Sequence, residues 1–188
     1  MAKQLGFFIN AGRCVQCQAC EVACKATNSI ELGPKWRRVA THWEGRFPDV
    51  TNIAASKACM HCAKPSCIDA CPVEAISKRA EDGIVVVDQE KCISCKSCGS
   101  ACPYGAPQYG KSGKMQKCIL CYSRIEKGKQ PACVSTCPGE ALGFGPIDEL
   151  VKLEGAIQPG GANRPSFVIV PAYRGVKAEH YAEVFFPR

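Results

Sequence analysis

The sequence predicts an α+β fold in which one cysteine-rich module is nested within another, with a connector loop and an extended C-terminal tail. Cysteine makes up 16 of the 188 residues, close to the share typical of chains that depend on cross-links. Aromatic residues are only 7%, whereas glycine and proline supply 17 and 13 residues. A sequence of this kind buries a thin core and needs cross-links of some kind to hold its segments together.

All sixteen cysteines fall into four groups of four. The groups are, in order, Cys14, Cys17, Cys20 and Cys24; Cys59, Cys62, Cys67 and Cys71; Cys92, Cys95, Cys98 and Cys102; and Cys118, Cys121, Cys133 and Cys137. Groups one and three have the spacing C-x2-C-x2-C-x3-C, group two has C-x2-C-x4-C-x3-C and group four has C-x2-C-x11-C-x3-C. A proline follows the last cysteine of groups two, three and four, whereas Lys25 takes that place in group one.

Three chemistries compete for these cysteines. Disulfides need an oxidising compartment, and C-x2-C pairs are too close for most such links. Zinc sites use two C-x2-C pairs or add histidine, and the chain has only three histidines. The run C-x2-C-x2-C-x3-C-P is instead the bacterial ferredoxin signature, in which three cysteines bind one cluster and the fourth binds its neighbour. The sequence therefore predicts four [4Fe–4S] clusters and two bacterial-ferredoxin-like dicluster modules.

The segment between groups two and three indicates how the groups pair. It reads as a short helix over Pro72–Ile76, a turn at Asp82–Gly83 and a strand over 84–88, which is the middle of a ferredoxin. Groups two and three then form one module, and groups one and four pair across it. The resulting ligand sets are Cys14, Cys17, Cys20 and Cys137; Cys24, Cys118, Cys121 and Cys133; Cys59, Cys62, Cys67 and Cys102; and Cys71, Cys92, Cys95 and Cys98. Sequential pairing, one with two and three with four, is the alternative.

This pairing divides the chain. Residues 1–30 and 108–148 form the outer module, 51–107 the inner module, 31–50 the connector, and 149–188 a helix, a strand and a tail. The other predicted elements, in order, are a strand at Phe7–Ile9, a loop over 103–117, a strand near 141–144, a helix from Ile147 to Leu153, a strand at Phe167–Val170 and the tail over 171–188. The stretch around the connector contains Trp36, Arg37, Arg38, Trp43 and Arg46, and we interpret it as a lid over a cluster, with partner docking as the alternative.

Charge and hydropathy exclude other classes. The net charge is +7, but aromatic residues do not alternate with basic ones, so no nucleic-acid partner is expected. Six basic residues against one glutamate over 111–129 lie close to cysteines, where they screen cluster charge or dock an acidic partner. No apolar run of 18 residues exists, so no direct membrane span is expected. Without a recognisable export signal we expect a cytoplasmic location, or a periplasmic one if a signal-bearing partner carries the chain across.

The three histidines are not predicted ligands, because the cysteines suffice. His42 and His180 lie outside the cysteine groups. His61 lies between Cys59 and Cys62, and we interpret it as a residue that tunes a cluster from outside its ligand set or as a plain loop residue.

The chain resembles the four-cluster iron–sulfur subunits of molybdenum and tungsten bis-pterin oxidoreductases, and most closely the dimethyl sulfoxide reductase iron–sulfur subunit family. The likeness covers residues 5–153 and is carried by CMHCAKPSCIDACPVEAI at 59–76, DGIVVVDQEKCISCKSCGSACPYGAPQY at 82–109, KCILCYSRIEKGKQPACVSTCPGEAL at 117–142 and FGPIDEL at 144–150. It implies two ferredoxin-like modules with nested cluster exchange and a non-covalent partner that carries the pterin cofactor. Some members replace a cysteine of the third group, but Cys98 and Cys102 are intact, so four cubanes are expected.

The expected function is relay of single electrons through the four clusters, between a Mo/W-pterin catalytic subunit and a second redox partner. That second partner is a membrane quinone-linked subunit, a flavoprotein or a ferredoxin. Three rivals stay open. One is an enzyme in its own right, although no Ser/His or His/Asp constellation stands out. Another is a soluble polyferredoxin carrier, including the polyferredoxin subunit of a tungsten aldehyde oxidoreductase. The third is a zinc protein.

Overall fold

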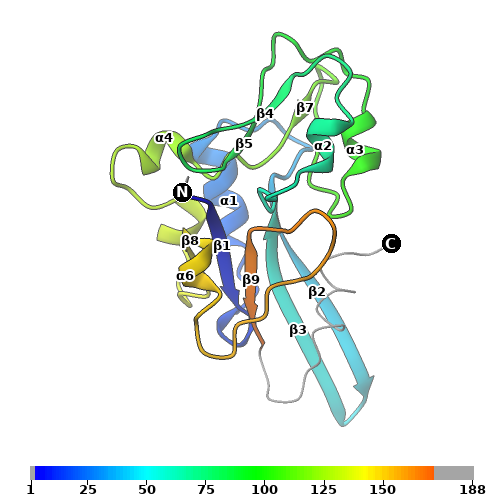
Figure 1. Ribbon diagram of the computed structural model, residues 1–188. Coiled ribbons are helices and arrows are strands. Elements are labelled where there is room, and N and C mark those ends of the chain that lie inside the picture. Colours follow the sequence, from blue (N-terminus) through cyan, green and yellow to red (C-terminus); the bar gives the residue numbers. More distant parts are fainter. Residues whose placement is uncertain (1–2, 172–188) are drawn as a thin grey trace.

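Figure 1 shows the computed structural model, which describes residues 3–171. The chain forms short strands and short helices joined by long loops, in a mixed α and β arrangement. The tail predicted over 171–188 lies outside the described residues, apart from Pro171. Within residues 3–171, no helix is long and apolar enough to cross a membrane.

A three-stranded sheet joins the start of the chain to its later part. It comprises β1 (Leu5–Asn10) between β8 (Leu142–Pro146) and β9 (Phe167–Val170). β1 runs antiparallel to β8 and parallel to β9, so Phe7 lies beside both Phe144 and Phe167. The strands predicted at Phe7–Ile9, near 141–144 and at 167–170 are confirmed. The sheet brings the segment before group one next to the segment after group four.

Residues 37–58 form the longest β-structure of the described chain. β2 (Arg37–Arg46) and β3 (Asp49–Ala58) pair antiparallel over their whole length. This hairpin extends away from the other elements (Figure 1). The prediction that 31–50 is a connector loop is therefore wrong from residue 37 onward. The strand signal is hidden because Ile53–Ser56 are buried in an unbroken run, so β3 lacks the alternation that marks a half-buried strand.

The segment between groups two and three is a β-hairpin. β4 (Ile76–Lys78) pairs antiparallel with β5 (Val85–Val87), and the turn between them contains Gly83 at a φ of 69°. The predicted turn and second strand are confirmed, but the helix predicted over Pro72–Ile76 is absent. The Ala75 N–H donates to the Cys71 sulfur and the Ala75 carbonyl accepts from Asp88, and these bonds replace those of a helix.

The remaining elements are short and carry or flank cysteines. They are a 3-10 turn over Ala11–Arg13, α1 (Ala19–Thr27), α2 (Ser66–Asp69), α3 (Ser97–Ala101), β6 (Gln108–Tyr109), β7 (Met115–Gln116), α4 (Tyr122–Ile125), α5 (Ala132–Ser135) and α6 (Ile147–Leu150). The loop predicted over 103–117 is interrupted only by the two-residue strands β6 and β7. The helix predicted from Ile147 ends at Leu150 rather than Leu153.

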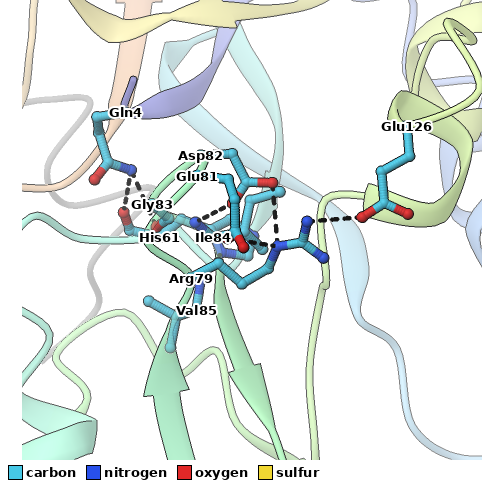
Figure 2. Close-up of polar contacts among 9 residues, drawn as sticks. All are labelled: Gln4, His61, Arg79, Glu81, Asp82, Gly83, Ile84, Val85 and Glu126. Carbon is cyan, nitrogen blue, oxygen red and sulfur yellow. Dashed lines mark hydrogen bonds and ion pairs between the residues drawn. The ribbon is translucent and has the colours of Figure 1, made fainter. Parts of the chain in front are cut away.

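Two polar networks join the β4–β5 hairpin to other parts of the chain (Figure 2). The Gln4 side-chain amide donates to the carbonyls of His61 and Gly83, at 3.1 and 3.2 Å. The Arg79 guanidinium pairs with Glu126 at 2.7 Å and with Asp82 at 3.2 Å, and lies 4.5 Å from the Tyr122 ring centroid. The turn of the β4–β5 hairpin is thereby held against both β1 and α4.

The apolar core is small and includes cysteines. The larger cluster collects buried residues of β1, β3, β8 and β9 together with Cys20, Cys59, Cys62, Cys118 and Cys133. The smaller cluster contains Ile76, Val85, Met115 and Cys98. Because sulfur atoms form part of both clusters, the packing of the fold depends on what those sulfurs bind.

Candidate cluster-binding sites

Helices α1 and α5 bring cysteines of groups one and four together. Cys20 and Cys24 lie one turn apart on α1, and both are buried. Cys133 lies on α5, which packs against α1. The cysteines that precede α1, Cys14 and Cys17, lie in the loop that leads into it.

The loops of groups one and three share an unusual backbone. Gln16 and Gln18 flank Cys17 with φ values of 58° and 60°, and Ser94 and Lys96 flank Cys95 with 62° and 63°. Cys17 and Cys95 themselves do not have positive φ. Alternation of left-handed and right-handed residues turns successive N–H groups toward one concave side, which binds anions. Both loops are therefore shaped to surround a negatively charged group.

Four cysteines line one cavity beside α1 and β8, namely Cys14, Cys17, Cys20 and Cys137. The Ala141 N–H donates to the Cys137 sulfur at 3.2 Å. Burial raises the pKa of the Cys14 thiol, and the neighbouring thiolates of Cys20, Cys137 and Cys17 raise it further. The four sulfurs thus interact with one another although Cys137 lies far along the chain.

A second cavity is built in the same way. It is lined by Cys71, Cys92, Cys95 and Cys98. The Ala75 N–H donates to the Cys71 sulfur at 3.3 Å, just as Ala141 donates to Cys137, because both cysteines begin a Cys-Pro-x-Glu-Ala segment. The Tyr109 hydroxyl lies 3.6 Å from the Cys98 sulfur.

The hydroxyl reaches Cys98 because residue 99 is glycine. A Cβ at Gly99 would lie 2.4 Å from the Tyr109 hydroxyl oxygen, too close for any other residue without movement of the ring. Group three is thus fitted to a specific aromatic neighbour.

Two further sets of four cysteines lie in the interior. In one, burial raises the pKa of Cys24 to about 12, the Arg37 charge lowers it, and the thiolates of Cys133 and Cys121 raise it. Burial likewise raises the pKa of Cys118, which interacts with Cys24 and Cys133. Cys24, Cys118, Cys121 and Cys133 are all buried.

The last set contains Cys59, Cys62, Cys67 and Cys102. Burial raises the pKa of Cys62 to about 12, and the thiolates of Cys59, Cys102 and Cys67 raise it further. The Cys67 pKa is also raised to about 12 by burial and by Cys59. All sixteen predicted ligands therefore lie next to other cysteines, in four neighbourhoods.

Backbone N–H groups donate to several of the cysteine sulfurs. In residues 3–171, no three or more His, Cys, Asp or Glu side chains lie close enough to hold one metal ion. The sulfurs are instead spread around a space, with backbone N–H groups donating to Cys71, Cys92, Cys118 and Cys137. Hydrogen bonds from the backbone to sulfur are one of the means by which proteins tune iron–sulfur clusters.

His61 is fully buried and bonded to the backbone. Its Nδ1 accepts a hydrogen bond from the Val85 N–H at 3.1 Å, so the ring proton resides on Nε2. Burial, with the charges of Lys117, Arg37 and Lys78, lowers its pKa well below the usual 6.5. His42 lies on β2 beside Glu44, and His180 lies outside the described residues.

Two cations from stretches that the sequence marks as functional are buried beside the sites. Arg37 lies in the stretch interpreted as a lid over a cluster, with partner docking as the alternative; it is buried and interacts with cysteines of two neighbourhoods. Lys117 belongs to the basic run that is expected to screen cluster charge or dock an acidic partner; it is buried, and its ammonium donates to the carbonyls of Val85 and Cys118. No sequence pattern separates either from the exposed basic residues around it.

Comparison with known proteins identifies the kind of cluster that this chain binds. Residues 50–147, about half of the chain, match the model of a 4Fe-4S dicluster domain, and residues 11–27 match a 4Fe-4S binding domain. The two matches together include all four cysteine groups. They support [4Fe–4S] clusters over zinc or disulfides.

Curated relatives cover most of the chain. A chain of the anaerobic dimethyl sulfoxide reductase of Escherichia coli is 44% identical, over 91% of this protein and 90% of that relative. A subunit of the sulfite dehydrogenase of Allochromatium vinosum is 35% identical, over 95% and 82%. The formate dehydrogenase iron-sulfur subunit of Wolinella succinogenes is 38% identical, over 77% and 82%. With its sixteen cysteines in four groups, the chain thus belongs to the dimethyl sulfoxide reductase family of iron–sulfur subunits and carries four [4Fe–4S] clusters.

Proposed function

We propose that this chain relays single electrons between a Mo/W-pterin catalytic subunit and a second redox partner. The relatives named above are subunits of reductases and dehydrogenases, which supports an electron-transfer role in an oxidoreductase complex. When bound, each cluster exchanges one electron at a potential that its surroundings set within roughly −700 to +450 mV. The observation that carries the proposal is the continuous series of four sulfur neighbourhoods.

Each neighbourhood holds one cluster in this proposal. The ligand sets are the four given by nested pairing: Cys14, Cys17, Cys20 and Cys137; Cys24, Cys118, Cys121 and Cys133; Cys59, Cys62, Cys67 and Cys102; and Cys71, Cys92, Cys95 and Cys98. The two cysteine-lined cavities and the mutual thiolate interactions support these sets over sequential pairing. The outer module is then 1–30 with 108–148, the inner module is 51–107, and the β2–β3 hairpin spans the 31–50 connector and the start of the inner module.

The sets form a single path. Cys24 interacts with Cys20 of the first set, and Cys118 interacts with Cys59 of the third. Cys67 of the third set interacts with Cys98 of the fourth. The order is therefore the Cys14 set, the Cys24 set, the Cys59 set and the Cys71 set, and every step joins neighbours.

The two ends of this path are exposed. Cys17 in the first set and Cys95 in the fourth are the exposed cysteines among the sixteen. Each lies beside an apolar residue that is also exposed, Val15 at 66% and Ile93 at 60%. An exposed ligand loop with an apolar contact suits electron exchange with a docked protein. We therefore assign the two loops as the places where the two redox partners bind.

Serine variants test the ligand sets. In Cys137→Ser, damage is expected at the cluster whose other ligands are Cys14, Cys17 and Cys20. The control is Cys133→Ser, which should affect the Cys24 set instead. Low-temperature EPR of the reduced complex, with iron and sulfide analysis, reads out which cluster is altered. The same spectral loss in both variants would contradict nested exchange.

Purification tests the partner. A subunit should copurify with a pterin-containing chain, and about 16 iron and 16 sulfide ions per copy are expected for four clusters. A stable chain that purifies alone with all four clusters would favour the soluble polyferredoxin carrier. The cytoplasmic location stays a prediction, which fractionation of cells would test against the periplasmic alternative.

A further inference from the structure

Arg37 is a buried charge without a carboxylate. It is the first residue of β2, and only 2% of the residue is exposed. The ion pairs of residues 3–171 do not include it. An unpaired buried cation costs several kcal/mol, so an anion must lie close by in the functional protein.

The contacts of Arg37 leave two donor nitrogens without a partner. Its Nη1 donates to the Ser56 hydroxyl at 3.1 Å and to the Ser56 carbonyl at 3.4 Å. The guanidinium carbon lies 4.4 Å from the Phe7 ring centroid. The two remaining nitrogens, Nε and Nη2, are buried and have no hydrogen-bond partner within the described residues.

Four cysteines interact electrostatically with this charge, namely Cys133, Cys118, Cys20 and Cys24. Three of these four cysteines belong to the Cys24 set and one belongs to the Cys14 set. The guanidinium therefore lies at the junction of the first two sites of the path.

Ser56 extends the contact to the first site. Its hydroxyl oxygen accepts from Arg37 and lies 3.3 Å from the Cys20 sulfur. Because the oxygen already accepts, the hydroxyl hydrogen is free to point at a Cys20 thiolate. Arg37 thus reaches one set directly and the neighbouring set through a single hydroxyl.

We infer that Arg37 is the buried counter-cation of the cluster held by Cys24, Cys118, Cys121 and Cys133, and that its unpaired Nε–H and Nη2–H groups face the negative charge of that cluster. This inference rests on the ligand sets proposed above. A fixed positive charge stabilises the more negative, reduced cluster, so Arg37 raises its reduction potential. In the first site Ser56 transmits a smaller part of the same effect. Arg37 is a tuning residue rather than a ligand.

Substitution of Arg37 tests this role in the intact complex. In Arg37→Met, which keeps an apolar stem over Phe7, the reduction equilibrium of the Cys24-set cluster should weaken about tenfold or more, or about 59 mV for one electron. Arg37→Lys keeps the charge and should shift it less. Potentiometric titration followed by EPR measures each cluster, and the Cys71-set cluster should be unchanged in both variants.

Arg38 supplies the matched control. It is the next residue of β2, and its guanidinium donates to the Gly105 carbonyl at 2.6 Å rather than facing sulfur. Arg38→Met should leave the potential of the Cys24-set cluster unchanged. An Arg37→Met complex with four clusters and unshifted potentials would overturn the inference. A shift confined to the Cys59-set or Cys71-set cluster would also overturn the inference, because Arg37 would then act on another cluster. The Cys137 and Cys133 variants test separately whether the ligand sets themselves are right.

A measurement on the unsubstituted protein covers the case in which Arg37→Met fails to assemble. Arginine labelled with ¹⁵N only in its guanidinium group should give a ¹⁵N hyperfine coupling to a reduced cluster in pulsed EPR. The coupling should persist in Arg13→Lys, which removes the labelled arginine that lines the cavity of the Cys14 set and pairs with Glu140. It should vanish in Arg37→Lys. A labelled protein with reduced clusters and no ¹⁵N coupling would overturn the inference.

Discussion

The Cys24 set and the Cys71 set are chemically the same, with four cysteines each, but their surroundings are opposite. The Cys24 set is buried on every cysteine and faces the Arg37 guanidinium. The Cys71 set lies by the smaller apolar cluster, with Cys95 exposed and the Tyr109 hydroxyl as its polar neighbour. One site is buried and faces a fixed charge, and the other has an exposed cysteine and a neutral hydroxyl.

The pKa values of the thiols differ in the same sense. Burial raises the pKa of Cys24 to about 12, whereas hydrogen bonds from Ser97 lower the pKa of Cys95 below its usual 9.0. A buried thiolate needs a cation or a metal cluster to exist, while an exposed one is stabilised by water and local donors. The thiolates of the Cys24 set therefore depend on the bound cluster and on Arg37, whereas Cys95 is stabilised by solvent and local hydrogen bonds.

The largest contrast is expected on ligand loss. Cys133→Ser should remove or damage the central cluster and lower the free energy of unfolding by about 5 kcal/mol or more, because metal binding there holds together segments with little core of their own. Cys95→Ser should damage only the Cys71-set cluster and leave the other three in place. Iron content and thermal unfolding measure both. Equal destabilisation by the two variants would mean that the Cys24-set cluster contributes no more to the stability of the fold than the Cys71-set cluster.

Metal removal should follow exposure. When the oxidised complex is treated with ferricyanide and an iron chelator, the Cys71-set cluster should be lost before the Cys24-set cluster, because Cys95 is open to solvent. EPR of samples reduced at intervals follows each cluster. Loss of the Cys24-set cluster first would show that exposure of the ligand does not control access of the chelator to the iron.

Loss of the buried carboxylate of Glu21 should lower the free energy of unfolding more than loss of the exposed carboxylate of Glu140. Glu21 is 7% exposed, and it accepts from the Val39 N–H at 2.6 Å and pairs with Lys35 at 2.7 Å. Glu21→Ala leaves the Val39 N–H without its partner, and a loss of about 1–3 kcal/mol is expected in unfolding.

Its control is Glu140→Ala. Glu140 pairs with Arg13 at 2.7 Å, but both side chains are more than half exposed. A loss of no more than about 1 kcal/mol is expected, because exposed ion pairs contribute little. Denaturant unfolding of the two variants compares them, and a larger loss from Glu140→Ala would reverse this order.

The smallest effect is expected at Tyr109. Tyr109→Phe removes the hydroxyl beside Cys98 and should lower only the potential of the Cys71-set cluster, by less than Arg37→Met lowers that of the Cys24 set. Burial, with the Cys98 hydrogen bond and charge, raises the pKa of Tyr109 above its usual 10.0, so the hydroxyl keeps its proton at every lower pH. The shift should therefore be independent of pH between about 6 and 9. A pH-dependent difference in EPR titrations would point to another group.

Much of this protein could be predicted from short-range pattern. The strand at Phe167–Val170 follows from an apolar β-branched run, and the turn before Ile84 follows from Asp82–Gly83. The β2–β3 hairpin could not be predicted in the same way, because Ile53–Ser56 are buried on both faces. The helix predicted at Pro72–Ile76 is wrong because a cysteine sulfur competes for the Ala75 N–H. Both errors come from the surroundings that the folded cysteine sites create.

The sequence by itself determined the number of cysteines, their grouping and the kind of cluster they bind, because ligand spacing is a local property. Only the tertiary structure decided which cysteines lie in the interior and which charge faces them. Arg37 and Arg38 are adjacent and chemically identical, yet one is buried among sulfurs and the other bonds the Gly105 carbonyl. A β-strand turns successive side chains to opposite faces, and packing then determines which face is the core.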